Sequence, residues 1–100
     1  MSASVSIKHG TIYLSAGVVD TYFRGIEAVI VLIREGGVHI LPVRQMAAGG
    51  CLLKIRNAVG DRVASAPDVF EANELLHWRA EDLTASWSRE DGALVVPLPD

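Results

Sequence analysis

The sequence has little cysteine, no long hydrophobic run and no low-complexity tract. Cys51 is the only cysteine, so no internal disulfide can form and we expect a reducing compartment, the cytoplasm. The longest apolar run, Ala28 to Ile33, is far shorter than the roughly 20 residues that span a bilayer. The opening Met1-Ser2-Ala3-Ser4 lacks the basic and apolar regions of a signal peptide. The sequence therefore predicts neither membrane insertion nor export.

The chain has 100 residues, half of them hydrophobic and 21% charged, which is the composition of one soluble globular domain. The net charge is −3 but is unevenly distributed. Up to Arg62 seven bases face four acids, a net +3, and from Val63 onward two bases face eight acids, a net −6. We therefore expect a basic surface between Arg44 and Arg62 and an acidic second half.

Alternating apolar and polar residues, separated by glycine-containing turns, are typical of β-hairpins. The first run of this kind turns at His9-Gly10 and the second at Arg34 to Gly37. The apolar run from Ala28 to Ile33 predicts a central strand. The four predicted hairpins are Ser4 to Leu14, Ala28 to Val43, Cys51 to Ala64 and Leu83 to Leu98.

Two short helices are predicted between these hairpins. Ser15 is placed to cap the first helix and Gly25 to end it, and its apolar residues recur at one-turn spacing: Val18, Val19, Tyr22 and Phe23. For the second, the Ser65 hydroxyl is a predicted cap, with a proline and an acid in the first turn, so we expect a helix from about Ala66 to Leu76. The fold class is therefore α+β and rich in strands.

The order hairpin, helix, hairpin occurs twice, which suggests an internal repeat. At an offset of about 50 residues Gly10 aligns with Gly60, and after an insertion of about five residues Arg34-Glu35 aligns with Arg89-Glu90. Chance matches in a chain rich in Gly, Ala and Val are the alternative. Since an isolated hairpin is marginal, two pseudo-repeats, about 3–43 and 53–99, should interlock around a pseudo-twofold axis in one small barrel. We expect residues 45–50 to connect them.

This order of elements resembles the swapped-hairpin transcription regulators of the AbrB and MraZ type, and two units in one chain are specifically similar to MraZ. The resemblance rests on the stretch from Asn57 to Pro67 and on its counterpart from Gly10 to Ser15. Asp61 between Gly60 and Arg62, and Thr11 in place of an arginine, depart from the family pattern. The resemblance implies a pseudo-twofold barrel, duplex DNA as partner and action as a homo-oligomer.

Four bases are the candidate nucleic-acid-binding residues: Arg44, Lys54, Arg56 and Arg62. Lys54 and Arg56 should point to solvent from one strand of the third hairpin, where they could contact several phosphates. The alternative is that these side chains simply solvate a strand face. No aromatic residue alternates with them in the sequence, so stacking on single strands is not expected.

We predict no catalytic residue, no cofactor and no metal site. His9, His39 and His77 lack metal-ligand spacing, and one cysteine makes no zinc signature. A nucleophile built from Cys51 and His39 is conceivable, but nothing local requires it. A half-buried, hydrogen-bonded His39 is the preferred interpretation, and the protein is predicted not to be an enzyme.

A protein-binding accessory or assembly module without a nucleic-acid role is the alternative function. Trp78 and Trp87 flank a predicted acidic loop, Glu81-Asp82, after the second helix. Aromatic side chains at the rim of an acidic surface are typical of partner-binding sites. The candidate partner-binding residues of the acidic half are thus Trp78, Glu81 and Asp82.

Overall fold

The computed structural model describes residues 3–44 and 50–98. The first part contains β1 (Ala3–Lys8), β2 (Thr11–Leu14), α1 (Ala16–Tyr22), β3 (Ala28–Arg34) and β4 (Gly37–Val43). The second part contains β5 (Gly50–Leu52), β6 (Lys54–Ile55), β7 (Arg62–Ser65), α2 (Pro67–Ala72), β8 (Arg79–Ser88) and β9 (Ala93–Pro97). The predicted connector lies outside the described residues except for Gly50, which begins β5.

The four predicted hairpins form, the third of them only between Lys54–Ile55 and the start of β7, because Cys51 and Leu52 pair with β3 instead. The pairs β1–β2, β3–β4, β6–β7 and β8–β9 are each antiparallel. Two-residue turns close the first two of them, and both residues of each turn have positive φ: His9 and Gly10, then Glu35 and Gly36. Such turns match the twist of the flanking strands and favour glycine, which explains why Gly10 and Gly36 were informative in the sequence.

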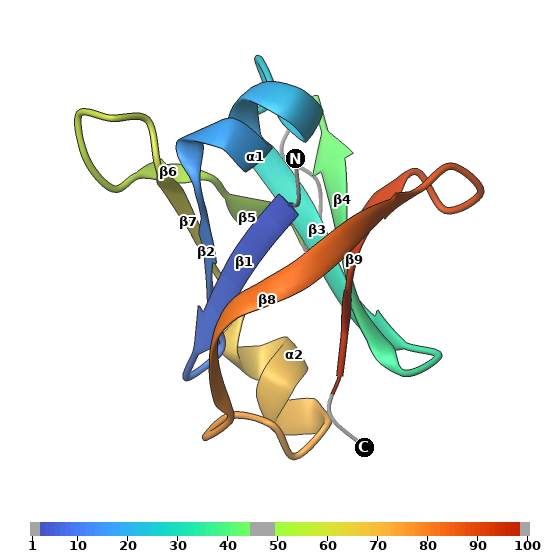
Figure 1. Cartoon of the computed structure of the whole chain (residues 1–100). Helices are drawn as coiled ribbons and strands as arrows, with labels where there is room; N and C mark the ends of the chain where they lie inside the picture. Colours follow the sequence, from blue (N-terminus) through green and yellow to red (C-terminus); the bar gives the residue numbers. More distant parts are fainter. Residues whose placement is uncertain (1–2, 45–49, 99–100) are drawn as a thin grey trace.

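The strands form one nine-stranded sheet in the order β5-β3-β4-β9-β8-β1-β2-β7-β6. Its two end strands, β5 and β6, follow one another in the chain and are separated only by Leu53. β5 pairs with β3 and β6 pairs with β7. The sheet therefore curls into a nearly closed barrel (Figure 1). The predicted fold class, a strand-rich α+β barrel of hairpins with two short helices, is confirmed.

Pairing between the two parts of the chain follows a pattern of exchange. β1 pairs with β8 and β5 pairs with β3, so the first hairpin of each part bonds to the second hairpin of the other. The remaining ladders join β2 to β7 and β4 to β9. In each of these ladders, the second strand of a hairpin pairs with the second strand of the corresponding hairpin in the other part. If each strand is replaced by the corresponding strand of the other part, the set of pairings stays the same. The hairpins of the two parts therefore interlock.

The first helix begins as predicted and ends earlier. The Ser15 hydroxyl accepts a hydrogen bond from the Val18 N–H at 3.4 Å, so Ser15 is the N-cap. The helix ends at Tyr22, and Gly25, with φ of 73°, lies in the turn beyond it rather than at the helix end. Within the described residues, no helix has the length and apolarity needed to cross a membrane.

The second helix is shorter than predicted, and its cap differs. Ala66 is the N-cap, without a side-chain hydrogen bond, while Ser65 is the last residue of β7. The Ala66 N–H instead donates to the Gly10 carbonyl at 2.9 Å, so a contact between the two parts starts the helix. The helix ends at Ala72, before the predicted Leu76, and Glu74 has φ of 59°, which helical backbone does not allow.

The barrel interior is filled by alternate residues of the strands, and the helices cover its two ends (Figure 1). Phe23, which follows α1, and Phe70 of α2 are fully buried in this core. Although β3 is central as predicted, with β4 and β5 on its sides, its apolar run is not buried throughout. Val31 points into the core, whereas Leu32 is 37% exposed on the outside.

Candidate functional site

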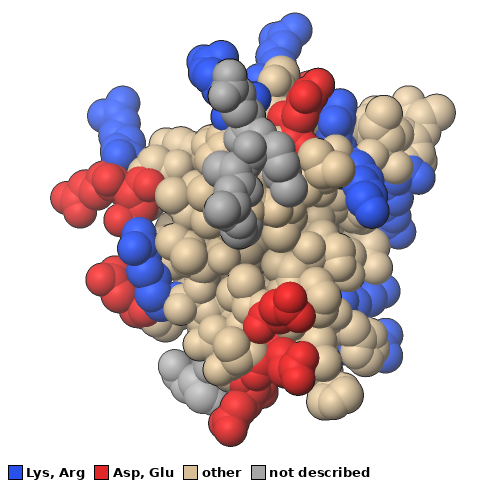
Figure 2. Space-filling view, turned by 180° about the vertical axis from the view of Figure 1, so that it is seen from behind, with Lys and Arg blue, Asp and Glu red and all other residues tan. Residues whose placement is uncertain are grey.

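The outside of the barrel has two chemically different surfaces. Residues that alternate with the core on β1, β2, β6 and β7 form what we call the polar face: Ser4, Ser6, Lys8, Thr11, Tyr13, Lys54, Val63 and Ser65. The corresponding outward side of β3, β4, β5 and β9 forms the apolar face, whose aliphatic residues are Ile30, Leu32, Leu41, Val43, Leu52 and Val95. His39 and Arg34 point to the same side. Figure 2, seen from behind, shows an uncharged band across the middle of the surface with charged side chains around it.

On the polar face, two cations converge on one aromatic ring. Tyr13 pairs with Ser6 on one side and with Val63 of β7 on the other. The Arg56 guanidinium lies 4.9 Å from the centre of the Tyr13 ring, and the Lys8 ammonium lies 5.9 Å from it. Both distances are in the range of cation–π attraction. No aromatic residue alternates with the bases in the sequence, but the fold brings Tyr13 of the first hairpin against Arg56.

The surface beside this ring is hollowed. Two adjoining hollows, each of about 180 Å³, share three lining residues, Ser6, Tyr13 and Arg56. Lys8 and Glu81 complete one of them. The other hollow is completed by residues of β1, β2 and β8 and by residues next to α1 and β7: Ser4, Leu14, Ser15, Asp61 and Asp82. Most of the lining side chains are polar, so the hollow suits a polar or charged ligand.

The loop that carries Arg56 is held in place by its own hydrogen bonds. The Asn57 side-chain oxygen accepts from the N–H groups of Val59 and Asp61, at 3.1 and 3.3 Å. The Asp61 carboxylate accepts from the Asn57 amide at 2.9 Å and from the Ala16 N–H at 2.8 Å, and these bonds lower the pKa of Asp61. Asp61 is therefore ionised and committed to the loop and to α1.

The four predicted nucleic-acid-binding residues do not form one cluster. Lys54 and Arg56 are exposed, as expected of the third hairpin, and neither has an ion-pair partner within the described ranges 3–44 and 50–98. Arg62 instead pairs with the buried Leu14, is half-buried, and donates to the Leu53 carbonyl at 3.4 Å. Arg44 is exposed just beyond β4, a strand of the apolar side of the barrel.

The candidate partner-binding residues of the second half interact within the molecule. Trp78 is half-buried and packs against the core. Glu81 and Asp82 lie inside β8 and not in a loop, because β8 pairs with β1 across an irregularity in register that these two residues occupy. Lys8 bonds to Glu81 at 3.0 Å and lowers the pKa of that carboxyl group.

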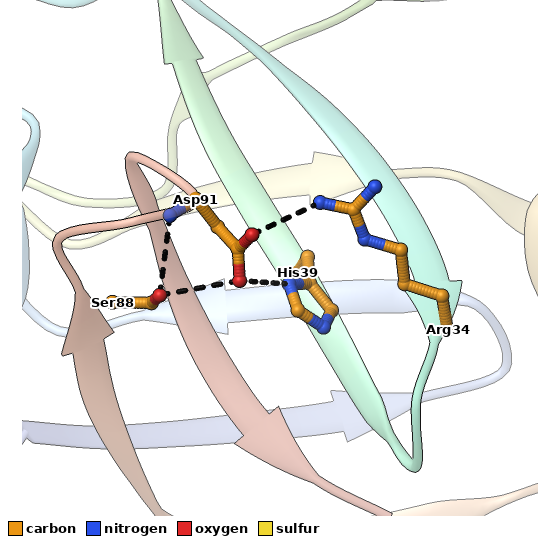
Figure 3. Close-up of polar contacts among 4 residues, drawn as sticks. All are labelled: Arg34, His39, Ser88 and Asp91. Atoms are coloured by element: carbon orange, nitrogen blue, oxygen red, sulfur yellow. Dashed lines mark hydrogen bonds and ion pairs between the residues drawn. The ribbon is translucent and has the colours of Figure 1, made fainter.

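A second polar cluster joins the turns of the β3–β4 and β8–β9 hairpins (Figure 3). The Asp91 carboxylate accepts from Ser88 Oγ at 3.2 Å and from Arg34 Nη2 at 3.4 Å. His39, only 3% exposed, places Nδ1 3.7 Å from Asp91, too far for a hydrogen bond. Among the residues that the structure describes, Nδ1 has no hydrogen-bond partner, so the expected hydrogen bond is not formed at this atom. Because the serine bonds to the carboxylate and not to the imidazole, this cluster is a latch between hairpins rather than an activated nucleophile.

The Cys51–His39 constellation is not assembled. Cys51 pairs with Val29 and packs against the core, whereas His39 pairs with Leu32 on the outside of the same sheet. Burial raises the pKa of the Cys51 thiol, which reduces its thiolate fraction. Across residues 3–44 and 50–98 there is also no group of three or more His, Cys, Asp or Glu side chains able to hold a metal ion.

Sequence reasoning missed Ser6, Lys8 and Tyr13 as members of the site. The outward alternation in the first hairpin already placed them on one face. Their proximity to Arg56 depends on the β2–β7 ladder, which joins residues far apart in the chain.

No family model, no curated protein and no solved structure matches this chain.

Proposed function

We propose that this protein is a non-catalytic, DNA-binding transcriptional regulator of the swapped-hairpin type that binds duplex DNA through its polar face. The observation that carries the proposal is the pair of exposed cations, Lys54 and Arg56, on the third hairpin, without ion-pair partners in the described parts of the chain. The exchange of strands between the two parts supports the swapped-hairpin interpretation.

The charges of the polar face are compatible with this role despite the net charge of −3. Asp61 and Glu81 lie close to the cations, but each already accepts hydrogen bonds within the protein. Arg56 lies against Tyr13, which restricts the guanidinium and lowers the entropy lost on binding a phosphate. Lys54 and Arg56 therefore remain available for the DNA backbone, while Arg62 and Arg44 contribute less.

The test is a fluorescence-anisotropy titration of duplex DNA at several salt concentrations. We expect a dissociation constant on the order of 10⁻⁴ to 10⁻⁶ M for non-specific duplex, weakening as salt rises. Lys54→Ala should weaken binding and reduce the salt slope by about 0.9, the value for one lost phosphate contact. Arg89→Ala, which removes an exposed cation from the β8–β9 turn, is the matched control and should change neither quantity. Absence of binding at low salt would refute the proposal.

Two further parts of the proposal concern partners. We expect a homo-oligomer, which sedimentation velocity would detect as a mass above the 10.7 kDa of one chain. The accessory or assembly module stays a prediction. Of the residues assigned to it, Trp78 packs against the core, and Glu81 and Asp82 already bond to β1 through Lys8, Ser4 and Ser6. Binding of a protein without any binding of DNA would favour that alternative.

A further inference from the structure

The hollow beside Tyr13 is lined by hydrogen-bond donors that have nothing to bind. Ser6 Oγ accepts from the Asp82 N–H at 3.1 Å, which leaves the hydrogen of its hydroxyl free to donate. In the described part of the chain, neither the Tyr13 hydroxyl nor the Arg56 guanidinium donates a hydrogen bond. These three side chains are the ones shared by both hollows.

The three carboxylates around the hollow each accept at least one hydrogen bond within the protein. Both carboxylate oxygens of Asp61 accept hydrogen bonds, from Ala16 and Asn57. Glu81 accepts from Lys8, and Asp82 accepts from the Ser4 hydroxyl at 3.3 Å. The hollow thus has free donors beside carboxylates that are already partly engaged, an arrangement that favours an acceptor-rich ligand.

We propose that Ser6, Tyr13 and Arg56 form a binding site for the oxygens of a phosphate group. An ionised ligand of this kind forms its strongest hydrogen bonds with a guanidinium, and hydroxyl groups supply further donors. Lys8, on the same ring as Arg56, adds a second positive charge at the edge of the hollow. The three nearby carboxylates oppose the anion, so a free phosphate should bind weakly.

The source of the phosphate rests on the proposed function. If the protein binds duplex DNA, Lys54 holds one backbone phosphate on the same face, and the hollow receives a neighbouring one. The two contacts then act together, since binding at Lys54 raises the local concentration of the next phosphate at the hollow. Free inorganic phosphate would use the hollow alone.

The first experiment titrates the whole protein with inorganic phosphate at constant ionic strength and follows backbone amide signals by NMR. We expect saturable shifts, with a millimolar midpoint, centred on Ser6, Tyr13 and Arg56. In the Arg56→Lys variant, which keeps the charge but loses the planar fork, the midpoint should rise at least about threefold. Shifts spread over all surface cations, or none near Tyr13, would overturn the assignment.

The second experiment measures duplex DNA binding by Tyr13→Phe and Ser6→Ala, each of which removes one hydroxyl. We expect each variant to weaken binding by roughly 3- to 10-fold, as for loss of one hydrogen bond. The salt slope should stay unchanged because no charge is lost. Ser86→Ala, an exposed serine of β8, is the matched control and should bind like the parent protein. Urea midpoints of all variants identify any that are unfolded.

The two experiments separate the failure of this site from the failure of the proposed function. Phosphate-induced shifts at Tyr13 without DNA binding would leave the oxyanion site standing and refute the DNA role. DNA binding that responds to Lys54→Ala but not to Tyr13→Phe or Ser6→Ala would retain the DNA role and refute the site.

Discussion

The two outer faces of the barrel belong to one sheet and share one core, yet their chemistry is opposite. Both faces are built by the same alternation, in which every second residue of a strand points inward. Outward residues on the polar face are mostly serines, a threonine, a tyrosine and cations, with Val63 among them, whereas those on the apolar face are mostly aliphatic, with Leu32 37% and Leu52 51% exposed. Arg34 and His39 are the polar side chains that point outward from β3 and β4. The inward residues of both faces pack into the same core. Packing of the core therefore does not explain why the outward residues are polar on one face and apolar on the other.

The contrast extends to the ways in which the faces are held. On the polar face, hydrogen bonds and the Lys8–Glu81 ion pair link β1 to β8, and Asp61 links the third hairpin to α1. On the apolar face, the main polar link described is the latch around Asp91, at the hairpin turns. The polar face is therefore held by polar side chains along its strands, whereas the apolar face is linked mainly at its turns.

The largest expected effect on the free energy of unfolding comes from substitutions of glycine in the turns of the first two hairpins. Gly10 and Gly36 have φ of 78° and 75°, so alanine at either position costs about 1 to 2 kcal/mol of strain. A Cβ at Gly10 would lie 2.7 Å from the Pro67 Cα, whereas one at Gly36 meets nothing within 4 Å. We expect Gly10→Ala to lower the free energy of unfolding by about 1 to 3 kcal/mol more than Gly36→Ala. Urea denaturation measures both, and equal losses would contradict the close packing of the turn on α2.

A smaller effect, dependent on pH, is expected for Asp61→Asn on the polar face. Hydrogen bonds lower the pKa of Asp61 in the folded protein, so its ionised form stabilises the fold above the usual Asp range, about pH 4. That stabilisation is lost as the pH falls through the lowered pKa. Urea midpoints should therefore differ most between the parent and the variant at pH 7, and the difference should shrink as the pH falls below about 4. A difference that does not change with pH would contradict this role.

The smallest effect is expected on the apolar face. Leu32→Thr replaces a side chain that points away from the core, and should lower the free energy of unfolding by about 0.5 to 1 kcal/mol. The neighbouring Val31→Ala removes buried methyl groups and should cost about 2 kcal/mol. A loss at Leu32 equal to that at Val31 would show that the apolar face is as closely packed as the interior.

The strands were predictable because their signals are local. Alternation over a few residues and glycine in the turns identify each hairpin without knowledge of its neighbours. The errors arise where tertiary contacts decide. The start of α2 is set by the Gly10 carbonyl and not by Ser65, and Glu81-Asp82 joins β8 because β1 supplies the pairing partner.

The candidate site was predictable in part for the same reason. Exposure of Lys54 and Arg56 follows from the third hairpin alone. Their neighbours Ser6 and Tyr13 follow only from the ladder between β2 and β7, which the sequence does not specify. Arg62 was misplaced because, at the end of the barrel, its pairing with Leu14 turns it toward the inside.

The short end strands of the sheet, β5 and β6, affect how readily the protein aggregates at high concentration. A long unpaired strand at the margin of a sheet attracts strands of other molecules, which is the first step toward fibrils. Here the marginal strands β5 and β6 are only three and two residues long, and β6 carries the charged Lys54. Such a margin offers few amide and carbonyl groups to a neighbour, so the native barrel is protected from aggregation by strand addition.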